Sequence, residues 1–158
     1  YAQTSYGGMP GAYTKNTTPK ASAIDKRSYK TLKRLRNYIN DGKNDKAADG
    51  AIELIRSLEN RKSDKYDPTY MNEAYNLLCI STANLGEIEY AMDVCSKSIK
   101  LSPDRWESYK SRATLYFMMQ NFPKSLSDFN LALENAPGTK NITDILKQNI
   151  KVVESKIN

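Results

Sequence analysis

The sequence predicts an all-α fold in which helical hairpins stack side by side. A pattern of 34 residues occupies residues 72–105 and recurs in residues 106–139, with Pro103 and Pro137 at the same place in each copy. Each copy holds two stretches of helical spacing, which are separated by a tight turn and ended by the proline. A fixed period of this length indicates a stacked repeat array.

The two copies also agree in the sizes of their side chains. Small residues recur where paired helices must approach closely, and bulky residues recur beside them. The small set is Cys79, Ala91, Ser98, Ala113, Ser125 and Ala132, and the bulky set is Tyr75, Leu78, Ile88, Tyr109, Tyr116, Phe122 and Phe129. We expect the turns at residues 84–86 and 120–121.

Residues 1–24 differ from the rest, because Gly, Pro, Ser, Thr and Tyr are scattered there without a helical period. We expect an extended, low-complexity tail. Ordering such a segment costs about 1–2 kcal/mol per residue, so we expect Tyr1, Tyr6 and Tyr13 to contact another subunit. The chain begins without Met, which fits either an excised fragment or removal of a transit peptide; the second reading favours an organelle over the cytosol.

A repeat domain is expected over residues 25–158, beginning with a degenerate repeat at about residues 28–60. Its turn is placed by Asp41 and Gly42, and Leu35 stands where the later copies have a small residue. Gly42 precedes Gly86 by one period plus ten residues, which predicts a charged loop at about residues 60–69. Pro68 suits the first turn of the next helix.

The chain ends in a segment at about residues 141–157 whose apolar residues have helical spacing: Ile142, Ile145, Leu146, Ile150, Val153 and Ile157. A single helix here would cover the apolar side that the last hairpin otherwise exposes. We therefore predict a C-terminal capping helix.

The order of aromatic, small, Ala and Pro positions in residues 72–137 resembles the tetratricopeptide repeat (TPR) family. The resemblance implies three TPR-like hairpins and a capping helix in a right-handed superhelical array, with a partner peptide or helix bound in a concave groove. In one subclass, a basic clamp grips the acidic C-termini of heat-shock chaperones. Those positions hold Leu32, Arg36, Leu77, Glu107 and Ser111 here, so we expect a non-clamp protein that does not bind these chaperone termini.

The resemblance places the predicted groove on the first helix of each repeat. The residues expected to line it are Leu32, Lys33, Arg36, Asn76, Leu77, Ile80, Lys110, Phe117 and Met118. If the apolar members are exposed, they suit an extended peptide or an amphipathic helix with acidic flanks. The alternative is that these apolar residues pack between helices.

Catalytic and metal-binding patterns are missing from the sequence. It has no His and only two Cys, and no glycine-rich phosphate loop opens a helix. We therefore predict no enzyme, no metal, no cofactor and no small-molecule substrate. Cys79 and Cys95 fall in the two helices of one hairpin, where they either fill the helix crossing or form a disulfide in an oxidising compartment.

The predicted first helix is strongly basic, with Lys26, Arg27, Lys30 and Arg34 at its start and no acid among them. This basic flank is either a solvated face or a docking site for an acidic protein surface or anionic lipid heads. No apolar run is long enough to span a membrane, so we expect a soluble or membrane-peripheral chain.

These observations predict an adaptor or scaffold subunit of a larger assembly, with one or more protein subunits as partners. Two alternatives remain open from the sequence. The first is a peripheral binder of anionic lipid or nucleic acid that acts through the basic first helix. The second is an assembly factor of an organellar complex, photosynthetic or respiratory.

Overall fold

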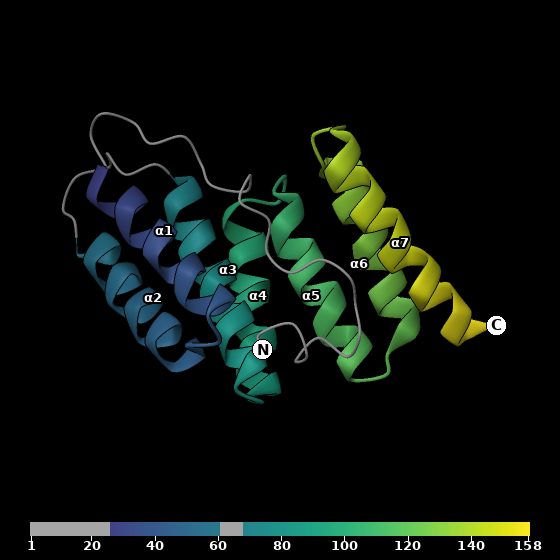
Figure 1. Ribbon diagram of the computed structural model, residues 1–158, viewed down its shortest axis with the longest axis horizontal. Helices are drawn as coiled ribbons and strands as arrows, with labels where there is room; N and C mark the ends of the chain where they lie inside the picture. The colour runs from purple at the N-terminus through teal and green to yellow at the C-terminus, as the bar shows by residue number, and fades with distance from the viewer. Residues whose placement is uncertain (1–25, 61–67) are drawn as a thin grey trace.

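The computed structural model describes residues 26–60 and 68–158, which form seven α-helices and no strand. The helices are α1 (Lys26–Asn40), α2 (Asn44–Glu59), α3 (Pro68–Asn84), α4 (Ile88–Leu101), α5 (Trp106–Met118), α6 (Phe122–Asn135) and α7 (Lys140–Ile157). Figure 1 shows them standing side by side along the long axis of the molecule. The predicted all-α repeat array is confirmed.

The helices pack as successive hairpins. Each hairpin pairs a first helix with a second, as α1 with α2, α3 with α4 and α5 with α6, and α7 packs against α6. The second helix of each hairpin also packs against the first helix of the next. In addition α1 packs against α3, and α3 against α5, so the three first helices are neighbours on one side of the array.

All three hairpin turns use the same backbone geometry, which explains where each first helix ends. Gly42, Gly86 and Gln120 each have a positive φ, of 75°, 86° and 60°. In every turn the next residue donates its N–H to a carbonyl five residues earlier: Lys43 to Tyr38, Glu87 to Thr82 and Asn121 to Tyr116, at 2.7–2.9 Å. These bonds satisfy carbonyls that a helix end leaves unpaired.

The first hairpin departs from the size pattern, and the structure supplies the compensation. Leu35 is fully buried at the position where the later hairpins have Cys79 and Ala113. Opposite it on α2 lies Gly50, where an added Cβ would collide with Leu35 Cδ2. The bulky residue is accommodated because its neighbour has no side chain.

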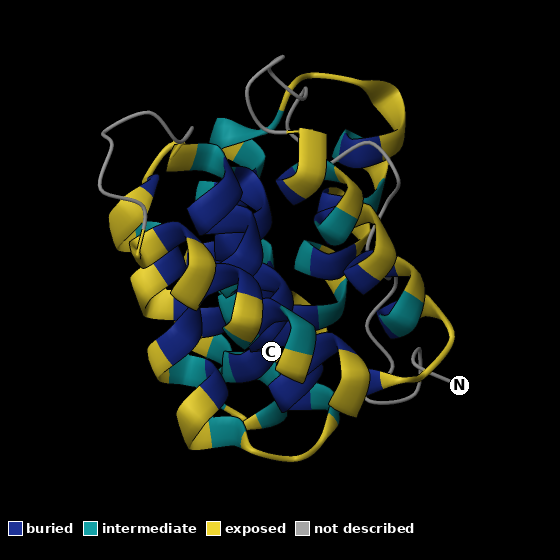
Figure 2. Ribbon diagram, turned by 90° about the vertical axis from the view of Figure 1, so that its left-hand side faces the viewer, coloured by how far each residue is buried: buried dark blue, intermediate teal, exposed yellow. Residues whose placement is uncertain are grey.

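The apolar side chains form two clusters along the array. The first is built from α1 to α4 and also includes Leu115 of α5. The second is built from α5 to α7 around Phe129, Leu146 and Val153. Figure 2 shows buried positions where helices face one another and exposed positions on their outer sides.

A buried polar network connects the second and third hairpins. The Asn72 amide donates to the Ser98 carbonyl oxygen at 2.7 Å, to Ser98 Oγ at 2.9 Å and to Ser108 Oγ at 3.1 Å. The two serine hydroxyl oxygens are 2.7 Å apart. The network therefore joins α3, α4 and α5 through groups whose hydrogen bonds are specific in direction.

Gln120 adopts the left-handed conformation that glycine adopts in the other two turns, so Gln120→Gly should raise the free energy of unfolding by about 1 kcal/mol. Gly86→Gln is the matched reverse change and should lower it by a similar amount, because an added Cβ there meets no atom within 4 Å and only the backbone cost remains. Urea unfolding measures both. Equal stability of Gln120→Gly and the parent would show that this turn is unstrained.

Candidate functional site: the first-helix face and the basic hollow

Charged side chains from three successive hairpins meet on the side where α1, α3 and α5 adjoin. We call this side the first-helix face and define it by Arg36, Glu73, Asn76, Arg105, Glu107 and Lys110. Glu73 Oε1 lies 3.9 Å from Arg36 Nε, and Glu73 Oε2 lies 3.6 Å from Arg105 Nη2. Arg105 Nη2 also lies 3.1 Å from Glu107 Oε1. One buried carboxylate of α3 thus lies between cations from the hairpins on either side.

Removal from water raises the pKa of both carboxyl groups of this face. Burial raises the pKa of Glu73 well above its ordinary range, the nearby Glu107 raises it further, and Arg105 opposes part of the rise. Burial also raises the pKa of Glu107, again against the charge of Arg105. Desolvation dominates because the two Glu73 ion pairs are long and neither of its oxygens accepts a hydrogen bond from a described residue.

The same face holds two further polar groups that the sequence predicted there. Neither amide atom of the fully buried Asn76 has a hydrogen-bond partner in the described part of the chain. Burial lowers the pKa of Lys110 to about 8. Both residues therefore carry a polar group whose environment a bound partner would change.

Three of the five apolar residues predicted for the groove are buried in a core, and the other two are partly buried. Leu32, Leu77 and Ile80 are buried members of the first cluster, and Met118 packs against it. Phe117 packs against the second cluster, where it meets the Phe122 ring edge to face at 5.5 Å. Leu32, Leu77 and Ile80 thus pack between helices, whereas Phe117 and Met118 are partly exposed and their place in a groove stays a prediction.

The structure places the remaining predicted polar residues differently. Lys33 is exposed on α1, whereas Arg36 is buried on the same helix. Ser111 donates its hydroxyl to the Glu107 carbonyl oxygen at 3.0 Å and stays within its own helix. Sequence reasoning missed Glu73 as the carboxylate that lies between Arg36 and Arg105, because the repeat pattern gives the face of a helix but not which charges meet across helices.

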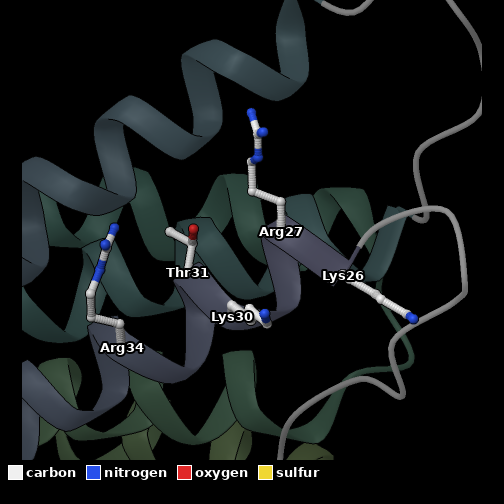
Figure 3. A pocket seen from close by; sticks show the side chains of 5 residues that line it. All are labelled: Lys26, Arg27, Lys30, Thr31 and Arg34. Carbon is white, nitrogen blue, oxygen red and sulfur yellow. The ribbon is translucent and has the colours of Figure 1, made fainter.

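The basic flank of α1 lines a hollow of 490 Å³. We call it the basic hollow and define it by its lining residues: Lys26, Arg27, Lys30, Thr31 and Arg34. Figure 3 shows Arg27, Thr31 and Arg34 projecting from the same side of α1, whereas Lys26 and Lys30 point in another direction from the same helix. All four cations predicted for this flank are therefore brought together, and Thr31 adds a hydroxyl that the sequence did not single out.

A second hollow, of 400 Å³, lies where α2 and α4 end against α3. It is lined by Glu59, Met71, Tyr75, Lys97, Lys100 and Leu101. The Tyr75 hydroxyl donates to Glu59 Oε1 at 3.3 Å across it. Sequence reasoning did not find this hollow, since it assigned Tyr75 to helix packing.

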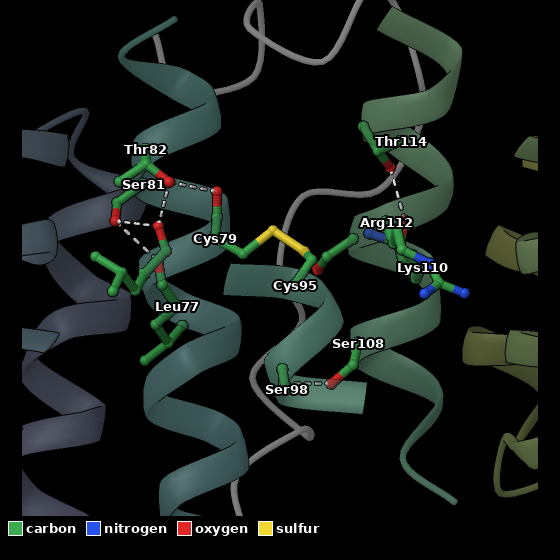
Figure 4. Close-up of a disulfide and its surroundings, with 12 residues drawn as sticks. Leu77, Cys79, Ser81, Thr82, Cys95, Ser98, Ser108, Lys110, Arg112 and Thr114 are labelled. Atoms are coloured by element: carbon green, nitrogen blue, oxygen red, sulfur yellow. Dashed lines mark hydrogen bonds between the residues drawn. A yellow bond between two sulfur atoms is a disulfide. The ribbon is translucent and has the colours of Figure 1, made fainter. Parts of the chain in front are cut away.

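The cysteines of the second hairpin are joined in a disulfide. Cys79 of α3 and Cys95 of α4 have Cα atoms 5.2 Å apart and are buried. Figure 4 shows the bond crossing between the two helices. The bond closes a loop with a sequence separation of 16 residues.

Three further expectations concern the N-terminal tyrosines with the inserted loop, metal binding and membrane-spanning helices. Tyr1, Tyr6 and Tyr13 lie outside the described residues, as does most of the inserted loop. Within residues 26–60 and 68–158, no three His, Cys, Asp or Glu side chains gather closely enough to hold a metal ion. None of the described helices has the length and hydropathy needed to cross a bilayer.

Comparisons with known proteins identify the fold. A TPR repeat-containing protein from Rhizobium etli is 45% identical over 47 residues, which cover 30% of this chain and 23% of the relative's length. The NMR structure of the first TPR domain of the human RPAP3 protein matches with a TM-score of 0.62 at 20% identity, covering 83% of this chain and 95% of that domain. The first TPR of Spaghetti (RPAP3), solved with the HSP90 peptide SRMEEVD, matches with a TM-score of 0.58 at 18% identity, covering 81% of this chain and 94% of that one. No family model matches the chain.

The raised pKa of Glu73 predicts a pH-dependent stability. Because the folded state favours the protonated carboxyl, the contribution of Glu73 is fully present below the unfolded pKa and is lost as pH rises through the folded pKa. Glu73→Gln should therefore raise the melting temperature at about pH 8 and lose this advantage toward about pH 4.5. Thermal unfolding across this range, with exposed Glu134→Gln as control, measures the effect. A variant less stable than the parent at the higher pH would show that the Arg36 and Arg105 pairs outweigh desolvation.

The disulfide predicts a redox-dependent stability. Cross-linking a loop of this length contributes about 3 kcal/mol to the free energy of unfolding in the chain-entropy model. Reductant should thus lower the urea midpoint of the parent and leave the double variant Cys79→Ala, Cys95→Ala unchanged. Intact mass without reductant should be lower than the fully reduced mass by two hydrogen atoms, and equal masses would show free thiols.

Proposed function

We propose that this chain, which has the tetratricopeptide-repeat fold, is a non-catalytic protein-interaction module that serves as an adaptor or scaffold subunit of a larger assembly. The observation that carries the proposal is the first-helix face, where three neighbouring helices share a largely buried chain of charges from Arg36 through Glu73 and Arg105 to Glu107, and where Arg105 and Lys110 are partly exposed. Stacked repeats offer an extended surface of this kind to a peptide or helix of a partner.

The charges of this face favour a partner of mixed polarity. The face holds the three basic residues Arg36, Arg105 and Lys110 and the two acidic residues Glu73 and Glu107, so groups of both polarities lie along it. The HSP90 peptide held by the Spaghetti domain carries two glutamates and an aspartate in its sequence SRMEEVD. Of the residues at the clamp positions, Leu32, Arg36, Leu77, Glu107 and Ser111, only Arg36 is basic, and we propose that chaperone C-termini of this type are not partners.

The N-terminal segment provides a second proposed contact with the same assembly. Tyr1, Tyr6 and Tyr13 supply aromatic rings of the kind that dominate the binding energy of interfaces. The basic flank provides a third contribution, because exposed cations steer an acidic surface toward α1. Such steering raises the association rate more than the final affinity.

A charge reversal on the first-helix face tests the proposal. The full chain, used as bait in an extract of its native source, should recover a defined set of protein subunits. Lys110→Glu should reduce that recovery at least about tenfold, since a buried or half-buried interfacial charge of the wrong sign costs several kcal/mol. Lys151→Glu on the exposed side of α7 makes the same charge change away from this face and should recover the parent amount.

Replacing Tyr1, Tyr6 and Tyr13 together by Ser should weaken recovery of the same subunits without changing the melting temperature. Equal losses with Lys110→Glu and Lys151→Glu would contradict binding at the first-helix face and indicate a general charge effect. Recovery unchanged by the three Ser substitutions would remove the N-terminal segment from the proposal.

A further inference from the structure

The net charge of the chain is concentrated at α1. The sequence has 24 Lys and Arg against 18 Asp and Glu, a net charge of +6. Residues 26–36 contain six of these cations and no acid. The other 18 cations equal the 18 acids, so α1 accounts for the whole excess. The positive electrostatic potential is therefore expected at the surface of α1 and not over the whole chain.

The cations of the basic hollow have no counter-charge in the described part of the chain. Lys26, Arg27, Lys30 and Arg34 are exposed, and none of them forms an ion pair with a residue of 26–60 or 68–158. Other cations do so, as in the bidentate pair of Arg112 with Asp128 at 2.6 and 2.9 Å. The hollow therefore combines four cations that form no ion pair with a described residue and the Thr31 hydroxyl.

The kinds of donor that surround the hollow match one chemical group. Arg27 and Arg34 are seven residues apart, so they lie about two turns from each other on the same side of α1, with Thr31 between them (Figure 3). A guanidinium presents a planar fork of donors that fits two oxygens of a phosphate, and a hydroxyl can donate to a third. Lys26 and Lys30 supply point charges suited to a dianion.

We propose that the basic hollow binds a phosphomonoester dianion carried by a phosphorylated residue of a protein partner. Arg27 and Arg34 hold the phosphate oxygens through their guanidinium forks, Thr31 donates its hydroxyl, and Lys26 and Lys30 balance the second negative charge. This inference rests on the proposed function in one respect, namely that the phosphate is carried by a protein. The hollow itself is independent of the first-helix face.

The surroundings of the hollow favour a protein over a membrane or a nucleic acid. The large apolar residues that are exposed among the described residues are Leu85, Tyr90, Leu101, Met119 and Ile157. None of these lies on α1, so α1 exposes no large apolar side chain that could insert into a bilayer beside the cations. Among residues 26–60 and 68–158, no aromatic ring lines the hollow, so these residues offer no platform for stacking with nucleic-acid bases.

The test is a titration of the full ¹⁵N-labelled chain with O-phospho-L-serine, with L-serine as the comparison that lacks the phosphate. Saturable amide shifts should appear at residues 26–34 with the phosphorylated compound alone. The double variant Arg27→Gln, Arg34→Gln should weaken the fitted affinity at least about tenfold, because charge-assisted hydrogen bonds are lost. Lys147→Gln with Lys151→Gln removes the same charge from exposed positions of α7 and should bind as the parent does.

A charge-preserving variant distinguishes binding by the guanidinium groups from attraction by positive charge alone. Arg27→Lys with Arg34→Lys keeps all four charges and should bind the phosphoserine about two- to tenfold more weakly than the parent. Parent-like affinity in this variant would overturn the assignment of the forks. Shifts that never saturate, or equal weakening in the α7 control, would overturn the site.

A vesicle experiment distinguishes a phosphorylated protein from a lipid headgroup as the source of the phosphate. The full chain is sedimented with phosphatidylcholine vesicles that contain phosphatidylserine or a phosphoinositide. We expect no sedimentation above that with phosphatidylcholine alone. Sedimentation that depends on Arg27 and Arg34 and that O-phospho-L-serine does not compete would overturn the protein partner in favour of a membrane surface.

Discussion

The close approach of α3 and α4 is the contact on which the rest of the molecule depends. The two helices can come this near because residues at their crossing are small: Cys79 on α3, with Ala91 and Cys95 on α4. The disulfide fixes the same crossing from within. Since α3 also packs against α1, α2 and α5, the position of this one hairpin sets the positions of the hairpins on both sides. A repeat array transmits such a constraint because each unit contacts only its neighbours.

The central place of α3 determines the electrostatics of the proposed binding face. Glu73 lies in the first part of α3, so stacking of the hairpins brings Arg36 to one side of it and Arg105 to the other. Both ion pairs are long, and desolvation keeps the carboxyl partly uncompensated. In the proposed function, this face selects partners chiefly by polar complementarity, because Leu32, Leu77 and Ile80 are buried in the first cluster.

The sequence allowed the repeat period, the hairpin turns and the capping helix to be predicted, because each depends on local chemistry. Gly86 indicates the left-handed turn of the second hairpin. The equivalent position in the third hairpin, Gln120, could be found by counting one period. The pairing of Leu35 with Gly50 could not be foreseen in this way, since it depends on how two helices cross in space. The basic hollow was partly predictable: the cations of α1 are adjacent in sequence, whereas the central place of Thr31 follows only from the side chains that surround it.

Amide hydrogen exchange of the full chain, measured with and without the recovered partner, tests the central claim most directly. The claim is that the partner lies along the first helices of the hairpins. Exchange should therefore slow in α1, α3 and α5 and change little on the exposed sides of α2, α4 and α6. Protection confined to α2, α4 and α6 would contradict the claim and place the interaction on the opposite side of the array.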